Sequence, residues 1–365
     1  MRVALISPYA LNIHGGVQEQ VIAMSRALSE RGHEVLVVAP NRDDDGHYDT
    51  PATVTRVGSL VSVPANGSRA PITLQPSVWR EVRAALRTFQ PDVVHSHEPF
   101  APIMSWSILR RHDWPLVATF HRSGGFSALR RLSTLFEGAR RGIDVAVSVS
   151  ESAARTARSD FGISTTVFFN GIDVDSLRRT PREVPDTVSI VTVGRLEERK
   201  GVSTLVAAVV RHNEQEPHVP WHLDVVGEGP ERTRLEEQAK GSVHIVFHGA
   251  LNHLEKNALL RRASVIVCPA LRGESFGIVL LEAMACEVPV VASDIDGYRQ
   301  AAGGMCLLAP PGDPIGVGAS IERALHMEPA AIEAAANYAA TWSMASLVER
   351  YEGLYRGAIR PDPSR

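Results

Sequence analysis

The sequence predicts an α/β protein made of two doubly wound domains. Three observations support this fold. Short β-branched runs alternate with amphipathic helical stretches along most of the 365 residues. Glycine-containing loops follow several of the predicted strands. A polar segment with two prolines, at 177–187, divides the alternating pattern into two parts and indicates a linker.

The first domain, expected at residues 1–178, opens with a strand at 3–7. A helix at 17–31 follows, because apolar residues recur there at helical spacing, and Gly32 ends it. Further strands are expected at 34–38, 92–95, 116–120, 144–148 and 166–168. Helical stretches lie between most of them, as parallel pairing requires.

The second domain, expected at residues 186–342, alternates strand and helix in the same way. Its clearest strands are expected at 189–193, 221–226 and 263–270. The stretch 342–356 has apolar residues at helical spacing and is expected to form a last helix.

Composition limits the function classes. A hydrophobic content of 44% and a charged content of 22% are ordinary for a globular protein, and the net charge of −3 argues against nucleic-acid binding. Residues 1–8 resemble a strand more than a signal peptide, and no apolar run reaches the ~18 residues that a membrane-spanning helix needs. We therefore expect a cytoplasmic protein, either a monomer or a weak oligomer.

No metal site is predicted. The three cysteines, Cys268, Cys286 and Cys306, are widely spaced. Cys268 and Cys286 lie in apolar segments, which favours buried thiols. His95 and His97 lack a third ligand at suitable spacing, so we expect them simply at the end of a strand. The acidic run at 43–45 is expected to be a solvated loop.

The most informative segment is ESFGIVLLE, which begins at Glu274 and ends at Glu282, after a predicted buried strand. Its two carboxylates are a little more than two helical turns apart. Backbone N–H groups of Ser275, Phe276 and Gly277 at the helix start can bind an anion. Each carboxylate alone could be structural. Together, beside an anion site, they suit a ligand with both phosphate and hydroxyl groups, such as a sugar nucleotide.

Two other loops belong to the same edge of the predicted sheet. Arg195 and Lys200 lie between a strand and a helix, and their side chains suit phosphate oxygens. Gly227 opens a Gly-x-Gly turn that alone is a poor dinucleotide fingerprint, since the third glycine is missing. Because ligands bind outside the carboxyl ends of parallel strands, the three loops together predict a ligand site.

Two features of the first domain also suggest a site. His121 directly follows the strand at 116–120, at the sheet edge where ligands bind, although a core histidine is the alternative. Gly15 and Gly16 would let the backbone approach a ligand closely, or would form only a tight turn.

Four segments stand in the order and spacing of the retaining glycosyltransferases of family 4: GRLEERKG, VVGEGPE, ALRGESFGIVLLEAMA and VVASDIDGY. The chain resembles this family over essentially its whole length. The resemblance implies the GT-B fold, with two Rossmann-like domains, a cleft between them and a last helix, 343–365, that joins the first domain. Within the family, the first half is most similar to actinobacterial phosphatidylinositol mannosyltransferases, in RVALISPYALNIHGGVQ, PANGS, HSHEPFAP and VATFHRS.

The resemblance also implies roles for single residues, with the acceptor in the first domain and a nucleotide-sugar donor in the second. Glu274 would hold sugar hydroxyls, Glu282 the ribose, and His121 the donor sugar. The expected catalytic residues are His121, Arg195, Lys200 and Glu274. The expected donor-binding residues are Gly16, Arg195, Lys200, Gly227, Glu274, Ser275, Phe276, Gly277, Ile278, Val279 and Glu282. The expected acceptor-binding residues are Tyr9, Gly15, Gly16, Asn66, Arg69 and His121.

The expected chemistry is sugar transfer with retained configuration. Arg195, Lys200 and the helix-start amides would stabilise the diphosphate leaving group. With two cations present, the sequence neither requires nor forbids Mg²⁺, and no cofactor is expected. No carboxylate is an obvious nucleophile, so we expect substitution on one face, in which the leaving phosphate helps to deprotonate the acceptor. Closure about the linker would exclude water.

The acceptor stays open at this point. Arg80, Arg83 and Arg87 share one face of a predicted helix, which could lie on an anionic membrane or be merely solvated. Lipid-modifying relatives have a denser basic cluster here and an aromatic residue where this chain has Ala65, and Arg69 follows the turn more closely than their arginine does. Transfer of mannose from GDP-mannose to phosphatidylinositol, on the inner face of the plasma membrane, is one hypothesis.

Two other functions are also open. One is transfer from a UDP-sugar to a soluble acceptor, such as a sugar alcohol, a polysaccharide precursor or a secondary metabolite. The other is a non-catalytic protein that only binds nucleotide sugars. The intact set of charged donor-site residues argues against the latter.

Overall fold

The computed structural model describes residues 1–13, 15–44, 46–65, 68–101, 103–109, 113–122, 137–182, 186–274 and 277–359. The chain divides into two compact units: unit 1 comprises Met1–Gly171 together with the chain from Met344 onward, and unit 2 comprises Ile172–Ser343. The sequence placed this division later, between residues 178 and 186. The difference arises because helix α7 (Val174–Arg179) packs against α10 (His253–Arg262) and α11 (Ile278–Ala285) of unit 2.

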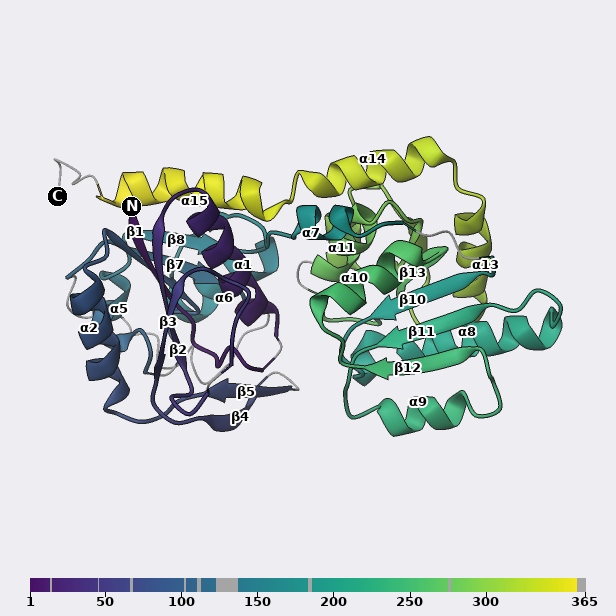
Figure 1. Ribbon diagram of the computed structural model, residues 1–365, viewed down its shortest axis with the longest axis horizontal. Helices are drawn as coiled ribbons and strands as arrows, with labels where there is room; N and C mark the ends of the chain where they lie inside the picture. The colour runs from purple at the N-terminus through teal and green to yellow at the C-terminus, as the bar shows by residue number, and fades with distance from the viewer. Residues whose placement is uncertain are drawn as a thin grey trace. The chain divides into compact units, whose positions relative to one another are not determined.

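Unit 1 is built on a seven-stranded parallel sheet with the order β3-β2-β1-β6-β7-β8-β9 (Figure 1). The strands are β1 (Arg2–Ile6), β2 (Glu34–Pro40), β3 (Thr53–Val57), β6 (Val93–His97), β7 (Leu116–Phe120), β8 (Val145–Ser148) and β9 (Thr166–Val167). The helices are α1 (Gly16–Glu30), α2 (Val78–Phe89), α3 (Trp106–Leu109), α5 (Glu137–Arg140), α6 (Glu151–Phe161) and α15 (Met344–Ile359). The central strands β6 and β7 are buried at every residue, as expected where helices cover both faces.

The sequence pattern did not predict β3 or the hairpin formed by β4 (Val61–Ala65) and β5 (Ser68–Ile72). Strand β3 is mostly half-buried, so its apolar pattern is weak. The hairpin sequence contains Pro64 and Pro71, and proline within a run normally argues against a strand. Here the two strands pair only with each other, in a separate two-stranded sheet, where missing donors are tolerated.

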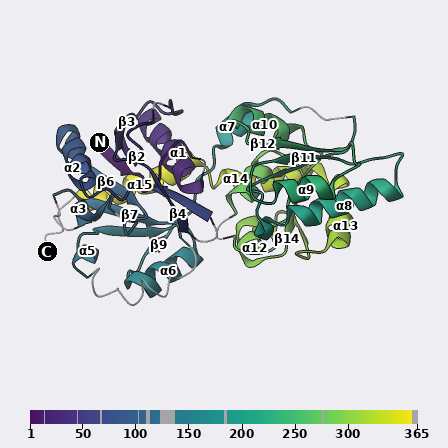
Figure 2. The same ribbon diagram turned by 90° about the horizontal axis from the view of Figure 1, so that it is seen from below.

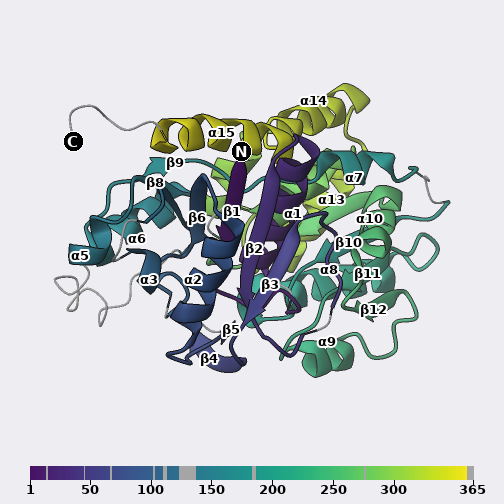
Figure 3. The ribbon, with the colours of Figure 1, turned by 60° about the vertical axis from the view of Figure 1, so that its left-hand side comes forward.

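Helix α15 packs against α1, β6 and β7 and so belongs to unit 1. Figure 3 shows it beside the N-terminus, where β1 begins. Glu352 on this helix is buried and accepts hydrogen bonds from Arg31 at 2.6 Å and from the ring of His33 at 2.9 Å. The hydrogen bond from Arg31 lowers the pKa of Glu352 to about 2, which ties the ionised carboxylate to the end of α1.

Unit 2 is built on a six-stranded parallel sheet with the order β12-β11-β10-β13-β14-β15. The strands are β10 (Ser189–Val193), β11 (His222–Val226), β12 (Ile245–Gly249), β13 (Val265–Cys268), β14 (Val290–Ser293) and β15 (Leu307–Ala309). The remaining helices are α8 (Val202–Gln215), α9 (Arg232–Gln238), α12 (Asp296–Ala302), α13 (Pro314–Leu325) and α14 (Pro329–Ala340). Figure 2 shows α8 and α13 on one side of β11 and β12 and α7 and α10 on the other.

The two parallel sheets confirm the predicted fold class of two doubly wound α/β units. In the part of the chain that the structure describes, no helix is both long and apolar enough to cross a bilayer.

Candidate functional site

The strand order of unit 2 marks where a ligand should bind. When the six strands are numbered in chain order, they lie across the sheet in the order 3-2-1-4-5-6. The chain therefore continues from β10 toward one edge of the sheet and from its neighbour β13 toward the other edge. The crevice outside the carboxyl ends of two such strands is the usual ligand site in open α/β sheets. Lys200 comes from the loop after β10 and Glu274 from the loop after β13.

The structure brings these two side chains together. Nζ of Lys200 donates to Oε1 of Glu274, and a guanidinium nitrogen of Arg199 lies 3.3 Å from the same oxygen. The side chains of Lys200 and Glu274 are 18% and 13% exposed, so water only partly screens the pair. The backbone joins the loops as well, since the Leu271 N–H donates to the Arg199 carbonyl at 2.8 Å.

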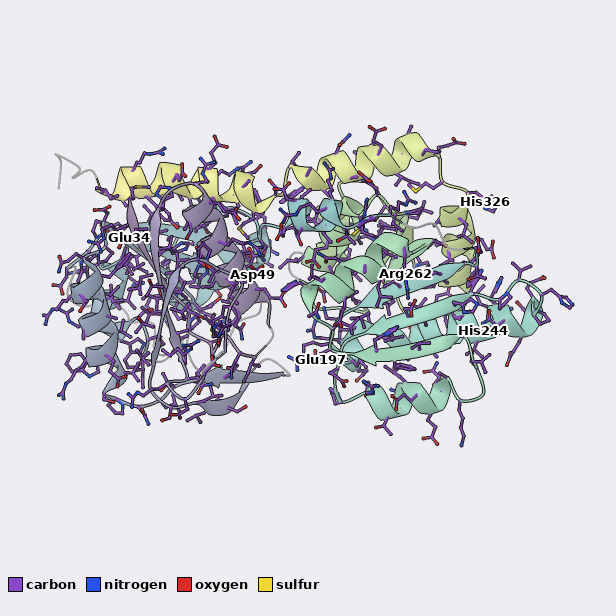
Figure 4. All side chains as sticks on the ribbon, viewed as in Figure 1. Glu34, Asp49, Glu197, His244, Arg262 and His326 are labelled. Atoms are coloured by element: carbon purple, nitrogen blue, oxygen red, sulfur yellow. The ribbon has the colours of Figure 1, made fainter. Side chains whose placement is uncertain are left out.

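Glu197 holds the arginines of the same loop. Its two carboxylate oxygens lie 3.1 Å from a nitrogen of Arg195 and 2.9 Å from Nε of Arg199. The Arg195 side chain is 51% exposed, so it remains accessible to a ligand. Figure 4 places Glu197 at the end of unit 2 toward which β10, β11 and β12 point. Glu197 and Arg199 were not among the predicted site residues, although the dense charge of RLEERK was a signal.

Two glycines allow the loops to approach so closely. A Cβ atom on Gly227 would lie 1.9 Å from the carbonyl oxygen of Gly194, and the φ of Gly227 is +134°. A Cβ atom on Gly201, whose φ is +65°, would lie 2.0 Å from the carbonyl oxygen of Pro269. Side chains at these positions would therefore push apart the loops that follow β10, β11 and β13.

Glu282 lies on α11 and has a partner of its own. Its Oε1 accepts from Nζ of Lys256 at 3.0 Å, and both side chains are less than a fifth exposed. Burial raises the pKa of the Cys268 thiol at the end of β13, and the carboxylates of Glu274 and Glu282 raise it further. Both predicted carboxylates therefore act on the same end of β13, although each is held by different cations.

The start of α11 is only partly described. Ser275 and Phe276, predicted to bind the donor, lie outside the described residues. Gly277 immediately precedes the helix, which begins with the predicted donor-binding residues Ile278 and Val279.

Unit 1 has a second cluster at the carboxyl ends of β6 and β7. Nδ1 of His97 lies 2.9 Å from Nε2 of His121. Oε1 of Glu98 accepts from the backbone N–H groups of His121 and Arg122, at 2.5 and 2.6 Å. Glu98 has a φ of +46°, an uncommon conformation for a residue with a side chain and one that often marks functional sites.

Burial controls the protonation of this cluster. It lowers the pKa of His121 to about 4 and that of His95 to about 3, and it lowers the pKa of His97 well below its usual value. Burial also raises the pKa of Glu98. The histidines are therefore neutral imidazoles at pH 7, which can hydrogen-bond but carry no charge.

The loop after β1 contributes to the same region. Burial raises the pKa of the Tyr9 phenol, and the nearby carboxylate of Glu98 raises it further. Because β1 and β6 are neighbours at the switch point of the unit 1 sheet, Tyr9, Glu98 and His121 lie at one edge. Gly15 precedes α1 and Gly16 begins it, and no described heavy atom lies within 4 Å of where a Cβ of Gly16 would be. Close approach of a ligand to Gly16 is thus sterically open.

The remaining predicted acceptor residues cannot be placed. Asn66 lies outside the described residues, and nothing is described of the Arg69 side chain.

The predicted arginine face of α2 is wrong in part. Arg83 is 5% exposed and pairs with Asp113, and its guanidinium lies over the Trp114 ring. Arg80 and Arg87 are exposed. Arg83 differs because it lies beside the buried face of α2, where Asp113, from the segment after the helix, pairs with it.

The acidic run at 43–45 is not simply a solvated loop. Asp44 accepts from the backbone N–H of Gly46 at 2.9 Å and from the Tyr48 hydroxyl, and it lies 3.4 Å from Arg56. Asp45 lies outside the described residues. Among those that are described, no three His, Cys, Asp or Glu side chains lie together as a metal site would require.

Comparison with known proteins matches both halves of the chain to one class. The family model described as Glycosyltransferase Family 4 matches residues 14–176, and the one described as Glycosyl transferases group 1 matches residues 187–327. The phosphatidyl-myo-inositol mannosyltransferase of Mycobacterium leprae is 37% identical over 86% of this chain and 84% of its own. The protein of the same name from Mycolicibacterium smegmatis is 35% identical over 88% of this chain and 84% of its own.

Solved structures show the same fold. A glycosyltransferase from Rickettsia africae has a TM-score of 0.77 at 15% identity and covers 99% of both chains. WaaG, a glycosyltransferase involved in lipopolysaccharide biosynthesis, has a TM-score of 0.66 at 19% identity and covers 97% of this chain and 100% of its own. The two units thus have the architecture of the GT-B glycosyltransferases.

The chain belongs to glycosyltransferase family 4. It is a retaining hexosyltransferase, which confirms the predicted family and enzyme class.

Proposed function

We propose that the protein transfers mannose from GDP-mannose to an inositol hydroxyl of phosphatidyl-myo-inositol, with retention of configuration. The observation that carries this proposal is identity of 34–37% to three phosphatidyl-myo-inositol mannosyltransferases, over 82–88% of the chain. The two matched family models cover both the Lys200–Glu274 pair and the His97–His121 pair, so both candidate clusters lie in the parts of the chain that match glycosyltransferases.

In the proposed donor site, Arg195 and Lys200 stabilise the diphosphate and Glu274 accepts hydrogen bonds from the sugar hydroxyls. Lys200 and Arg199 hold the Glu274 carboxylate, which restricts its orientation before the sugar arrives. Glu282, fixed by Lys256, binds the ribose.

Backbone N–H groups complete the proposed donor site. The start of α11, from Gly277 to Val279, presents them toward the phosphates, and Gly227 allows the donor to approach the neighbouring loop. Ser275 and Phe276 precede this helix start and are assigned the same role.

The proposed reaction places positive charge beside the leaving group. As the bond between the sugar and the diphosphate breaks, negative charge develops on the phosphate, and Lys200 and Arg195 stabilise it. The leaving phosphate then takes the proton of the acceptor hydroxyl on the same face of the sugar, which retains the configuration. His121 serves this reaction as a neutral hydrogen-bonding group, because its pKa of about 4 leaves it uncharged at pH 7.

In the proposed acceptor site, Tyr9, Gly15 and Gly16 surround the headgroup together with His121. Asn66, which lies between β4 and β5 in the sequence, and Arg69 of β5 also contribute. A peripheral position on the inner face of the plasma membrane would bring the lipid within reach. Exposed Arg80 and Arg87 on α2 support such binding at about 1 kcal/mol each. This attraction is modest, because the third arginine of the expected face is buried.

The test is a matrix of donors and acceptors. Purified protein is incubated with GDP-mannose, UDP-glucose or UDP-galactose and with phosphatidylinositol vesicles or free myo-inositol, and the products are identified by mass spectrometry. The proposal predicts mannosylated phosphatidylinositol from GDP-mannose as the fastest reaction. Faster glycosylation of the free alcohol would instead support the soluble-acceptor function, which Ala65 and the burial of Arg83 favour.

A further inference from the structure

Three imidazole rings form a stack across the ends of β6 and β7. The rings of His95 and His97 have centroids 4.4 Å apart and are inclined by 23°. The rings of His97 and His121 have centroids 5.1 Å apart and are inclined by 29°. The parallel pairing of β6 and β7 sets His97 beside Thr119, so His121 lies two residues beyond the pair. Of the three residues, His121 alone is more than marginally exposed.

The hydrogen bonds of the stack are unequally distributed. Both ring nitrogens of His95 are occupied, by the hydroxyls of Tyr355 and Thr119, each at 2.7 Å. Nδ1 of His97 is bonded to Nε2 of His121. Nε2 of His97 is buried, and no partner for it lies among the residues that the structure describes. His95 cannot supply one, because its nitrogens are already bonded.

Of the two possible proton arrangements, one is favoured by the cost of the group that it leaves unpaired. A neutral imidazole carries one N–H and one acceptor nitrogen. If Nε2–H of His121 donated to His97, the proton of His97 would sit on its Nε2, as a buried N–H with no acceptor. If Nδ1–H of His97 donates instead, Nε2 of His97 is an unpaired acceptor. Orphaned buried N–H groups are the rarer and costlier of the two.

The arrangement has a consequence for His121. With Nε2 of His121 accepting from His97, its single proton lies on Nδ1. None of the described residues accepts a hydrogen bond from that nitrogen, and His121 as a residue is half-buried. The backbone of His121 is held separately, because its N–H donates to Glu98. Ring tautomer and backbone position are thus both fixed before any ligand binds.

We propose that His97 is a positioning residue that locks His121 in the Nδ1–H tautomer. His121 then offers a hydrogen-bond donor to an oxygen of the bound substrate, either a sugar hydroxyl or a phosphate oxygen, and does not act as a base through Nε2. The inference rests on the proposed role of His121 at the reaction centre, but the tautomer itself can be measured without any substrate.

The primary experiment is a long-range ¹H–¹⁵N correlation spectrum of the full chain labelled with [¹⁵N]histidine, at neutral pH. Loss of one ring system in His121→Gln assigns His121. The expected spectrum shows a protonated Nδ1 and an unprotonated Nε2 for this residue. A protonated Nε2 in the wild type would overturn the proposal.

Three variants separate positioning from packing. His97→Phe keeps an aromatic ring in the stack but cannot donate a hydrogen bond. It should lower kcat for transfer from GDP-mannose by at least about 10-fold. This loss should stay smaller than the ~10²-fold loss that is typical when a preorganised donor is itself removed. His97→Asn, which can place an amide N–H near the position of Nδ1, should restore most of that rate. Tyr355→Phe removes a hydroxyl from the same network but leaves the His121 ring bond intact, and should keep both tautomer and rate.

Equal losses in His97→Phe and His97→Asn, with unchanged Tm, would contradict a role for the N–H. If His97→Phe fails to fold, the wild-type spectrum and the rate of His97→Asn still test whether the His97 N–H fixes the His121 tautomer. A wild-type protein that shows the expected tautomer but does not mannosylate phosphatidylinositol would overturn the proposed acceptor and leave this inference standing.

Discussion

Replacing Lys200 by alanine should slow sugar transfer strongly while leaving the fold intact. Lys200 is assigned to the developing charge on the diphosphate, and loss of one such charge-assisted contact costs about 2–4 kcal/mol of barrier. At about 1.4 kcal/mol per tenfold change in rate, this corresponds to a roughly 30- to 1000-fold lower kcat. The structure favours the upper part of this range, because Glu274 also loses its closest cationic partner and, among the described side chains, keeps Arg199 at 3.3 Å.

The assay is release of GDP from GDP-mannose with phosphatidylinositol vesicles, followed with a coupled enzyme. Arg272→Ala is the matched control, since it removes a cation from the loop after β13. The Arg272 side chain is 67% exposed, and its guanidinium lies 3.8 Å from the Glu198 carboxylate. It should change kcat little. Circular dichroism and Tm should match the wild type in both variants. A folded Lys200→Ala protein with near-normal kcat would refute the donor-site assignment.

The other predictions concern binding, stability and the membrane. Glu274→Gln should bind GDP almost normally by titration calorimetry yet lose transfer, whereas Glu282→Gln should weaken GDP itself; the reverse pattern would mean that the two roles are exchanged. Glu352 has a folded-state pKa of about 2, below its ordinary value of 4.5, so its stabilisation is present above about pH 4.5 and is lost as the pH falls toward 2. The Tm advantage of wild type over Glu352→Gln should therefore be full at pH 7 and shrink through this window, and a constant difference would count against the linkage. Serine at both Arg80 and Arg87 should reduce sedimentation with phosphatidylinositol vesicles at low salt, as added sodium chloride should also do, and no effect of either would exclude this face of α2 as the membrane contact.

The sequence predicted the edge of each sheet at which the candidate sites are placed, but not which side chains meet there. Lys200 and Glu274 could be assigned to one edge because both follow parallel strands. Their direct pairing depends on β10 and β13 being neighbours, and strand order is not visible in a local pattern. The contact of Arg199 with Glu274 was missed for the same reason, whereas Glu197 pairs within its own loop, with Arg195 and Arg199.

The histidine pair shows a similar limit. His97 and His121 each follow or end a recognisable strand, but their contact depends on the register of β6 against β7. The helical spacing in α2 predicted one shared face for Arg80, Arg83 and Arg87, which is wrong for Arg83 because this residue is buried. The spacing could not show that Asp113, from beyond the helix, removes Arg83 from the surface. Periodicity predicts which face of a helix is buried, whereas partners from other segments determine whether a residue at the edge of that face is exposed.

The most direct test of the central claim is a crystal structure of the protein with GDP-mannose. We expect the diphosphate at the carboxyl ends of β10 and β13, with Lys200 and Arg195 within hydrogen-bonding distance of phosphate oxygens and the Glu274 carboxylate on the mannose hydroxyls. A nucleotide sugar bound elsewhere on unit 2, or bound there with Glu274 still paired to Lys200 and away from the sugar, would contradict it.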